Sequence, residues 1–124
     1  MNSGIPHVNA NTINFLYIQL KFAPLLIQQE EKDNQGSFFI EEDGIQLAEM
    51  DYSLSPPNTM VILHTEVDEV LKGRNIGNQL INHAVQYARI KNYKIIPLCP
   101  FVKSVFEKRP EEFKDVVKGK EVKE

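Results

Sequence analysis

The feature of this sequence that most restricts its fold is a change in the spacing of its apolar residues. Up to about residue 67 the apolar residues tend to alternate with polar ones, which is typical of β-strands. From Arg74 to Asn92 they recur at helical spacing instead, and polar side chains fill the other face. The apolar positions of this predicted helix are Ile76, Leu80, Ile81, Ala84, Val85 and Ala88. After it, Tyr93–Leu98 is short and apolar and predicts one more strand.

The segments on either side of this helix determine the topology of the sheet. Asn58–Val67 precedes the helix and Tyr93–Leu98 follows it, and a helix of this length joins parallel strands through a right-handed crossover. The earlier strand candidates are separated by turn signals and are expected to be antiparallel. These strands are Leu25–Gln29, Ser37–Glu41 and Ile45–Leu54, and the turns are Asp33–Gly36, Glu42–Gly44 and Ser55–Pro57. We therefore predict an α/β fold of mixed α+β type, with antiparallel N-terminal strands before a parallel strand–helix–strand unit and a C-terminal helix.

The C-terminal region is predicted to be helical, because Pro100 and Pro110 each stand where a helix can begin. The apolar positions that follow these prolines are Phe101, Val102, Val105, Phe106, Phe113, Val116 and Val117. We expect residues 1–124 to form one domain with flexible ends at Met1–Asn11 and Lys118–Glu124. Ile13–Leu20 alternates like an extra edge strand, which leaves a monomer and a homodimer both open.

Composition narrows the functional class. The 124 residues include 14 Lys plus Arg and 17 Asp plus Glu, a formal net charge of −3, so we predict neither a nucleic acid nor a membrane surface as partner. Polar residues and a proline interrupt Ile13–Ile27, which is too short for a membrane span. One cysteine and three widely spaced histidines match no usual zinc spacing, so no metal is predicted. The lone thiol and the lack of a targeting segment lead us to expect a cytoplasmic protein.

The predicted topology brings a glycine-containing turn to the sheet edge where open α/β sheets bind ligands. Gly73 and Gly77 allow close approach of the backbone, Lys72 and Arg74 add positive charge, and a helix start offers N–H donors. This combination favours a pyrophosphate ligand. A glycine-containing helix start with solvated basic side chains is the alternative interpretation, and the turn alone does not decide between them.

Two further groups are predicted at the same edge. Strict alternation along the strand puts Met60, Ile62, His64 and Glu66 on one face, so His64 and Glu66 would end an apolar face where they can accept a proton from an amine. A hydrogen-bonded core histidine and a merely exposed glutamate are the alternatives. Cys99 lies between a strand end and a helix start, where the helix dipole can activate a thiol, although a buried inert thiol fits the position equally well.

In this order and spacing, three blocks of the sequence resemble the GNAT N-acetyltransferase superfamily, and specifically its short single-domain branch. The blocks are His64-Thr65-Glu66-Val67, Leu71-Lys72-Gly73-Arg74-Asn75-Ile76-Gly77-Asn78-Gln79-Leu80 and Pro97-Leu98-Cys99-Pro100-Phe101-Val102, within a resemblance that covers about residues 36–117. The resemblance implies an acetyl-coenzyme A site. Its cofactor-binding residues would be Glu66, Val67, Lys72, Gly73, Arg74, Asn75, Ile76, Gly77, Asn78, Cys99 and Phe101.

The same resemblance implies the reaction. Pantetheine would lie between the two parallel strands, a backbone N–H near Glu66 and Val67 would polarise the thioester carbonyl, and an amine would attack directly. The acceptor would be a small molecule or a protein or peptide amine. The catalytic candidates are Glu66, His64 and Cys99.

The sequence departs from the superfamily pattern at two points. Asn75 stands where the first glycine of the turn is expected, and no tyrosine follows Tyr93 to protonate the leaving thiolate. Cys99 is the candidate to replace that tyrosine, either as the acid or as a residue that briefly carries the acetyl group, and we favour the direct route. The short chain and the missing tyrosine also leave a rival function open, a coenzyme A-binding module without turnover.

Overall fold

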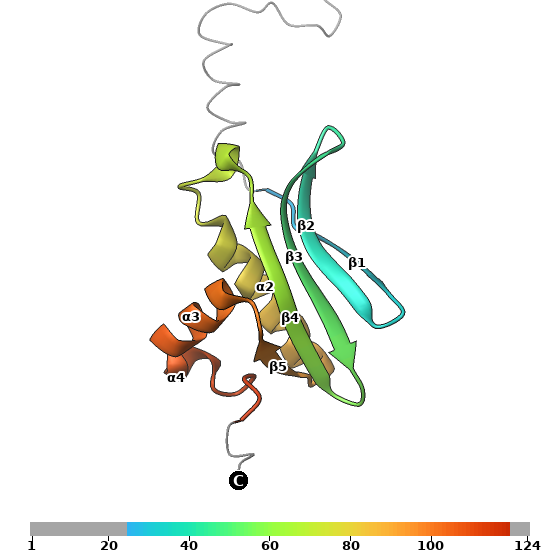
Figure 1. Cartoon of the computed structure of the whole chain (residues 1–124), viewed down its shortest axis with the longest axis vertical. Helices are drawn as coiled ribbons and strands as arrows, with labels where there is room; N and C mark the ends of the chain where they lie inside the picture. Colours follow the sequence, from blue (N-terminus) through green and yellow to red (C-terminus); the bar gives the residue numbers. More distant parts are fainter. Residues whose placement is uncertain (1–24, 120–124) are drawn as a thin grey trace, which may run out of the picture.

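Residues 25–119, which the computed structural model describes, form one five-stranded sheet with helices packed against one face (Figure 1). The strands are β1 Gln28–Lys32, β2 Gln35–Glu42, β3 Ile45–Ser55, β4 Thr59–Val67 and β5 Lys94–Pro97, in that spatial order. The helices are the short η1 Glu69–Leu71, α2 Ile76–Lys91, α3 Pro100–Lys108 and α4 Pro110–Phe113. The predictions for Met1–Asn11, Ile13–Leu20 and residues 120–124 lie outside the described residues.

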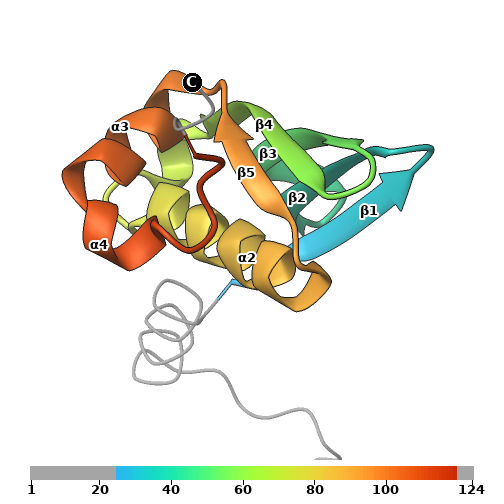
Figure 2. The ribbon, with the colours of Figure 1, turned by 90° about the horizontal axis from the view of Figure 1, so that it is seen from below.

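The strand directions confirm the predicted mixed fold. β1 to β4 are antiparallel neighbours, whereas β4 and β5 are parallel and are joined through α2. Figure 2 shows α2 lying along one side of the sheet, with α3 and α4 beyond it near β5. The other face of β2, β3 and β4 carries none of the described helices. Within residues 25–119 the sheet therefore has one face in the core and one face without a helix, which we call the open face.

The hairpin turns are tighter than the sequence suggested. Asp33 and Asn34 have φ values of 54° and 65°, which are those of a two-residue type I′ turn. Since only these two residues form the turn, Gln35 joins β2 and Lys32 joins β1. The first strand is therefore Gln28–Lys32 and not Leu25–Gln29. Such a turn fits the twist of an antiparallel pair, which is why the chain needs no longer loop here.

The predicted helical stripe forms the centre of the core. Its members in α2 are all buried, and they pack with Met50, Met60, Ile62 and Ile95 of the sheet in one cluster. Val102 and Phe106 of α3 join the same core. Phe101 does not, because 40% of its surface is exposed at the start of α3, so its predicted place on the apolar core face is wrong.

A bulge in β4 changes which side chains face the core. Tyr52 pairs with Ile62 but Asp51 pairs with His64, so Leu63 is an extra residue in β4. A one-residue shift moves every later side chain to the opposite face of a sheet. The prediction that His64 and Glu66 share a face with Met60 and Ile62 is therefore wrong. Thr65, which pairs with buried Met50, takes the place on the helix face instead.

The last described residues are fastened to the outer edge of β5. The N–H of Ile95 donates to the carbonyl of Val116 at 2.6 Å, and the N–H of Lys118 donates to the carbonyl of Ile95 at 2.8 Å. The Arg89 guanidinium binds both carboxylate oxygens of Asp115, at 2.8 and 3.0 Å. Lys118, predicted to begin a flexible tail, is thus hydrogen-bonded. None of the helices within residues 25–119 has the length and apolar character needed to cross a membrane.

The glycine at position 36 gives a test of this packing. A Cβ at Gly36 would overlap Cζ of buried Tyr52 and would lie 2.8 Å from the carbonyl oxygen of Glu30. We expect Gly36→Ala to lower the free energy of unfolding by about 1–3 kcal/mol, because overpacking forces strain into the core. Urea denaturation measures this loss. The neighbouring change Ser37→Ala is the control and should stay within about 0.5 kcal/mol; equal stability of both variants would contradict the observed packing.

Candidate functional site

A cavity of about 350 Å³ lies on the helix face of the sheet, where β4 ends and α2 begins. It is lined by Thr65, Val67, Leu71, Lys72, Gly73, Asn75, Ile76, Gly77, Asn78 and Phe101. Most of the cofactor-binding residues predicted from sequence thus come together. The remaining three predicted residues, Glu66, Arg74 and Cys99, do not line the cavity. Thr65 and Leu71 line it although the sequence did not predict them.

The turn before α2 owes its shape to two left-handed residues. Gly73 has φ +84°, and Asn75 has φ 61° as the residue that precedes the helix. The first backbone hydrogen bond of the helix runs from the N–H of Gln79 to the carbonyl of Asn75, at 3.2 Å. A helix start leaves its first N–H groups without acceptors inside the helix. At this start those groups belong to cavity-lining residues, which is a geometry that suits an anion.

Asn75 stands where the superfamily pattern has a glycine, and it adopts the left-handed conformation that this position needs. Asparagine is one of the few residues with a side chain that enters the left-handed region routinely. The Asn75 side-chain oxygen accepts a hydrogen bond from the Asn78 amide at 2.7 Å, so the asparagine also ties the turn to the first helical turn. The backbone shape that a glycine would permit is therefore kept.

Gly77 and Phe101 form one wall of the cavity. A Cβ at Gly77 would lie only 2.6 Å from Cζ of Phe101, so the ring rests directly against the glycine backbone. This contact joins the start of α2 to the start of α3. Phe101 is accordingly a wall of the candidate site rather than a core residue.

Cys99 lies just behind the cavity. Its N–H donates to the carbonyl of Ile62 at 3.0 Å, and only 3% of its surface is exposed. Its Sγ donates to the Thr65 hydroxyl oxygen at 3.3 Å, and Thr65 in turn lines the cavity. Sequence reasoning missed Thr65 as a site residue, because strict alternation placed it on the wrong face and no pattern in the sequence marks the bulge at Leu63.

His64 and Glu66 lie on the open face of the sheet. His64 Nε2 is 3.3 Å from Glu66 Oε2, and both side chains are exposed. Glu49 is the direct cross-strand partner of Glu66. Asp51, hydrogen-bonded to Glu49, raises the pKa of the Glu49 carboxyl, and partial burial raises it further. The open face thus carries carboxylates close enough to affect one another.

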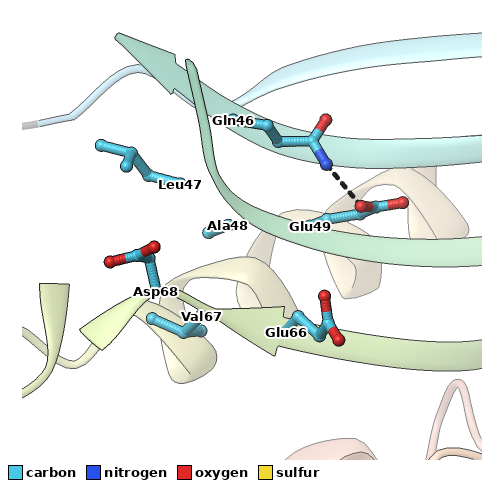
Figure 3. Close-up of a pocket in the computed structure, with 7 residues that line it drawn as sticks. All are labelled: Gln46, Leu47, Ala48, Glu49, Glu66, Val67 and Asp68. Carbon is cyan, nitrogen blue, oxygen red and sulfur yellow. Dashed lines mark hydrogen bonds between the residues drawn. The ribbon is translucent and has the colours of Figure 1, made fainter. Parts of the chain in front are cut away.

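A second, smaller cavity of about 250 Å³ lies between the ends of β3 and β4 (Figure 3). Glu49 and Glu66 line it together with Asp68, and Val67 lines both cavities. Figure 3 shows Glu49 and Glu66 on neighbouring strands, with Asp68 near the end of β4. Val67, at the end of β4, is therefore the residue that the two linings share. Within residues 25–119, no group of three His, Cys, Asp or Glu side chains could hold a metal ion.

The parallel pairing of β4 with β5 ends beside a helix start, and a cavity is lined there by the end of β4, the turn before α2 and the start of α3. A family model described as GCN5-related N-acetyl-transferase matches residues 37–116. The chain belongs to this family. Membership and fold together support an acyltransferase.

Solved structures agree with this assignment to the GCN5-related family. The chain is similar to a GCN5-like candidate N-acetyltransferase from Staphylococcus aureus, with 33% identity, a TM-score of 0.60, and coverage of 79% of this chain and 92% of that one. A ribosomal-protein-alanine N-acetyltransferase from Brucella melitensis shares the fold at 15% identity and a TM-score of 0.52, covering 63% of this chain and 62% of that one.

The fold is shared more widely. An aminoglycoside N-acetyltransferase in complex with CoA matches at 13% identity and a TM-score of 0.50, covering 67% of this chain and 88% of that one. No curated protein matches the sequence significantly.

The left-handed turn gives a prediction for the site. We expect Asn75→Ala to lower the free energy of unfolding by about 1–2 kcal/mol, because alanine resists left-handed backbone angles. Asn75→Gly also loses the side-chain hydrogen bond to Asn78, but glycine adopts the left-handed backbone conformation without strain. The glycine variant should therefore be more stable than the alanine variant. Chemical denaturation of both variants measures the cost of the left-handed backbone conformation at this position. Equal stabilities of the two variants would contradict a left-handed conformation at position 75.

Proposed function

We propose that this chain is an acetyl-coenzyme A-dependent N-acetyltransferase that transfers the acetyl group directly to an amine. The observation that carries the proposal is the cavity at the start of α2, where a left-handed turn and apolar walls meet in a member of this family. The three blocks at this sheet edge would form its motif.

The lining of the cavity fits coenzyme A in chemistry. The first N–H groups of α2 and the Lys72 ammonium are donors for a pyrophosphate, and Lys72 is exposed and pairs with Glu69 at 3.6 Å. Leu71, Ile76 and Phe101 give the apolar wall that a pantetheine arm requires. When bound, acetyl-coenzyme A would supply the thioester that makes the acetyl group transferable.

The proposed reaction uses both faces of β4. The last pair of β4 with β5 is Ile62 with Pro97, and β4 continues beyond it to Val67. This part of β4 has the candidate cofactor cavity on one face and the side chains of His64 and Glu66 on the other. In this arrangement Glu66 takes the first proton from the arriving ammonium and so frees its lone pair, and His64 beside it takes the second as the nitrogen attacks the carbonyl carbon. A backbone N–H at Glu66 or Val67 stabilises the oxyanion. The nitrogen–carbon bond forms as the carbon–sulfur bond breaks.

The acid for the departing sulfur is proposed to be Cys99. It is the thiol behind the cavity, and it takes the role that a tyrosine has in larger relatives. We favour direct transfer over an acetyl-cysteine intermediate, because exchange of one thioester for another gains little reactivity. The burial of Cys99 also supports this choice, since a nucleophile must reach the carbonyl carbon.

The acceptor is proposed to be a primary amine that arrives at the open face as a cation. The smaller cavity offers three carboxyl groups, those of Glu49, Glu66 and Asp68. The face around it is open, which suits an amine on a peptide or protein as well as a small molecule.

Ligand-dependent unfolding tests the cofactor site. At about 100 times its dissociation constant, coenzyme A should stabilise the protein by about 2.7 kcal/mol, a shift of several degrees in Tm. Gly77→Ala should reduce the shift, because the new methyl displaces Phe101 into the cavity. Gly44→Ala, in a hairpin turn that does not line the cavity, is the glycine control: its φ of +80° makes the alanine costly, but its shift relative to its own unliganded Tm should be full. The absence of a shift with the unaltered chain would contradict the proposal.

Acetyl transfer to a panel of amines tests the chemistry. We expect Glu66→Gln to lower kcat by about 10²-fold or more through loss of the base, with coenzyme A binding unchanged. Intersecting initial-rate patterns and no added acetyl mass on the protein would support direct transfer, whereas ping-pong kinetics with an acetyl mass lost in Cys99→Ala would show the covalent route. Binding of coenzyme A without transfer to any amine would favour a binding module instead.

A further inference from the structure

Thr65 occupies a position between a buried thiol and the candidate cofactor cavity. On one side its Oγ1 accepts a hydrogen bond from Cys99 Sγ at 3.3 Å. On the other side the same residue lines the cavity, together with Val67 and Phe101. Cys99 itself does not line the cavity, and only 3% of its surface is exposed. The hydrogen bond to Thr65 therefore connects the buried thiol to a residue that lines the cavity.

The direction of this hydrogen bond gives the threonine a defined chemistry. A hydroxyl has two lone pairs and one proton, so an oxygen that accepts from a thiol still has its own O–H to donate. Because the thiol occupies one side of Thr65, that O–H can point to the cavity side. Valine and threonine differ mainly by this hydroxyl, and both have a stiff, β-branched side chain.

We propose that Thr65 is a catalytic residue of the acetyl transfer, a relay that carries the proton of Cys99 to the departing sulfur. The inference rests on the proposed function. As the carbon–sulfur bond breaks, its electron pair stays on the sulfur, and Thr65 gives that sulfur its hydroxyl proton. In the same step Thr65 Oγ1 takes the Sγ proton of Cys99. Cys99 is left as a thiolate and regains a proton from solvent once the products leave.

The bulge in β4 is what makes the relay possible. If β4 alternated strictly through Leu63, with no bulge, Thr65 would lie on the open face and both His64 and Glu66 would face α2. The bulge comes directly after Ile62, whose carbonyl accepts the N–H groups of both Leu98 and Cys99 at 3.0 Å. The bulge at Leu63 therefore turns the Thr65 side chain toward α2. It also lies next to the hydrogen bonds that hold the backbone of Cys99.

The test compares Thr65→Val with Thr65→Ser. We expect Thr65→Val to lower the single-turnover rate of acetyl transfer by about 10²-fold, the usual contribution of a general acid, while the Tm shift with coenzyme A stays unchanged. Thr65→Ser retains the hydroxyl and should stay within about threefold of the unaltered rate. Thermal unfolding without ligand checks that both variants are folded.

Two further readouts separate a relay from a structural role. The proton inventory, in which rates are measured in mixtures of H₂O and D₂O, should be curved for the unaltered chain, since two protons move together, and linear for Thr65→Val. In the Thr65→Val, Cys99→Ala double variant the loss of rate should be no larger than in either single variant, because both residues serve one path.

The outcomes are distinct. A Thr65→Val rate within about threefold of the unaltered rate, or losses that multiply in the double variant, would overturn the relay while leaving the acetyltransferase in place. An unaltered chain that transfers acetyl to no amine would overturn the proposed function itself. If Thr65→Val fails to fold, loss of activity in Cys99→Ala together with a linear proton inventory for the unaltered chain would still refute the relay.

Discussion

The structure depends on one irregularity of backbone pairing, the extra residue Leu63 in β4. Up to Ile62 the strand follows the rule that alternate side chains enter the core, and there it pairs with both β3 and β5. After the bulge its pairing with β5 ends and its side chains exchange faces. A β-bulge bends and twists a strand, and such bulges are frequent beside active sites. Here the bulge lies beside the place where two parallel strands separate.

The core holds this irregularity in position. The buried stripe of α2 packs on the sheet, and so the start of the helix is fixed against the end of β4. That start is shaped by Gly73 and Asn75 in left-handed conformations, and it touches α3 through Gly77 and Phe101. The cavity is thus a meeting of three fixed elements, which is the arrangement that gives a binding site its precision.

The consequence is a division of chemistry between the two faces of one strand. The helix face offers helix N–H groups, the Thr65 hydroxyl and the thiol behind it, all suited to the cofactor and its leaving sulfur. The open face offers Glu66, His64 and Glu49, suited to a cationic amine. In the proposed function a single strand serves both the donor and the acceptor of an acetyl group, because the functional groups of β4 alternate in direction. This division is an economical way for a chain of 124 residues to present both.

The sequence by itself determined the order of strands and helices, the parallel crossover and the turn at the start of α2, because hydrophobic period and turn residues are local signals. Topology alone also brought Val67 and the turn from Lys72 to Asn78 to one edge, and the family resemblance added Phe101. Only the tertiary structure decided the direction of His64, Thr65 and Glu66, the length of the first turn and the exposure of Phe101. A bulge leaves no mark in the residue pattern, because it is a property of how neighbouring strands pair and not of the residues of one strand. The side chains that face the candidate cavity were therefore fixed by packing between strands and not by the order of residues within one.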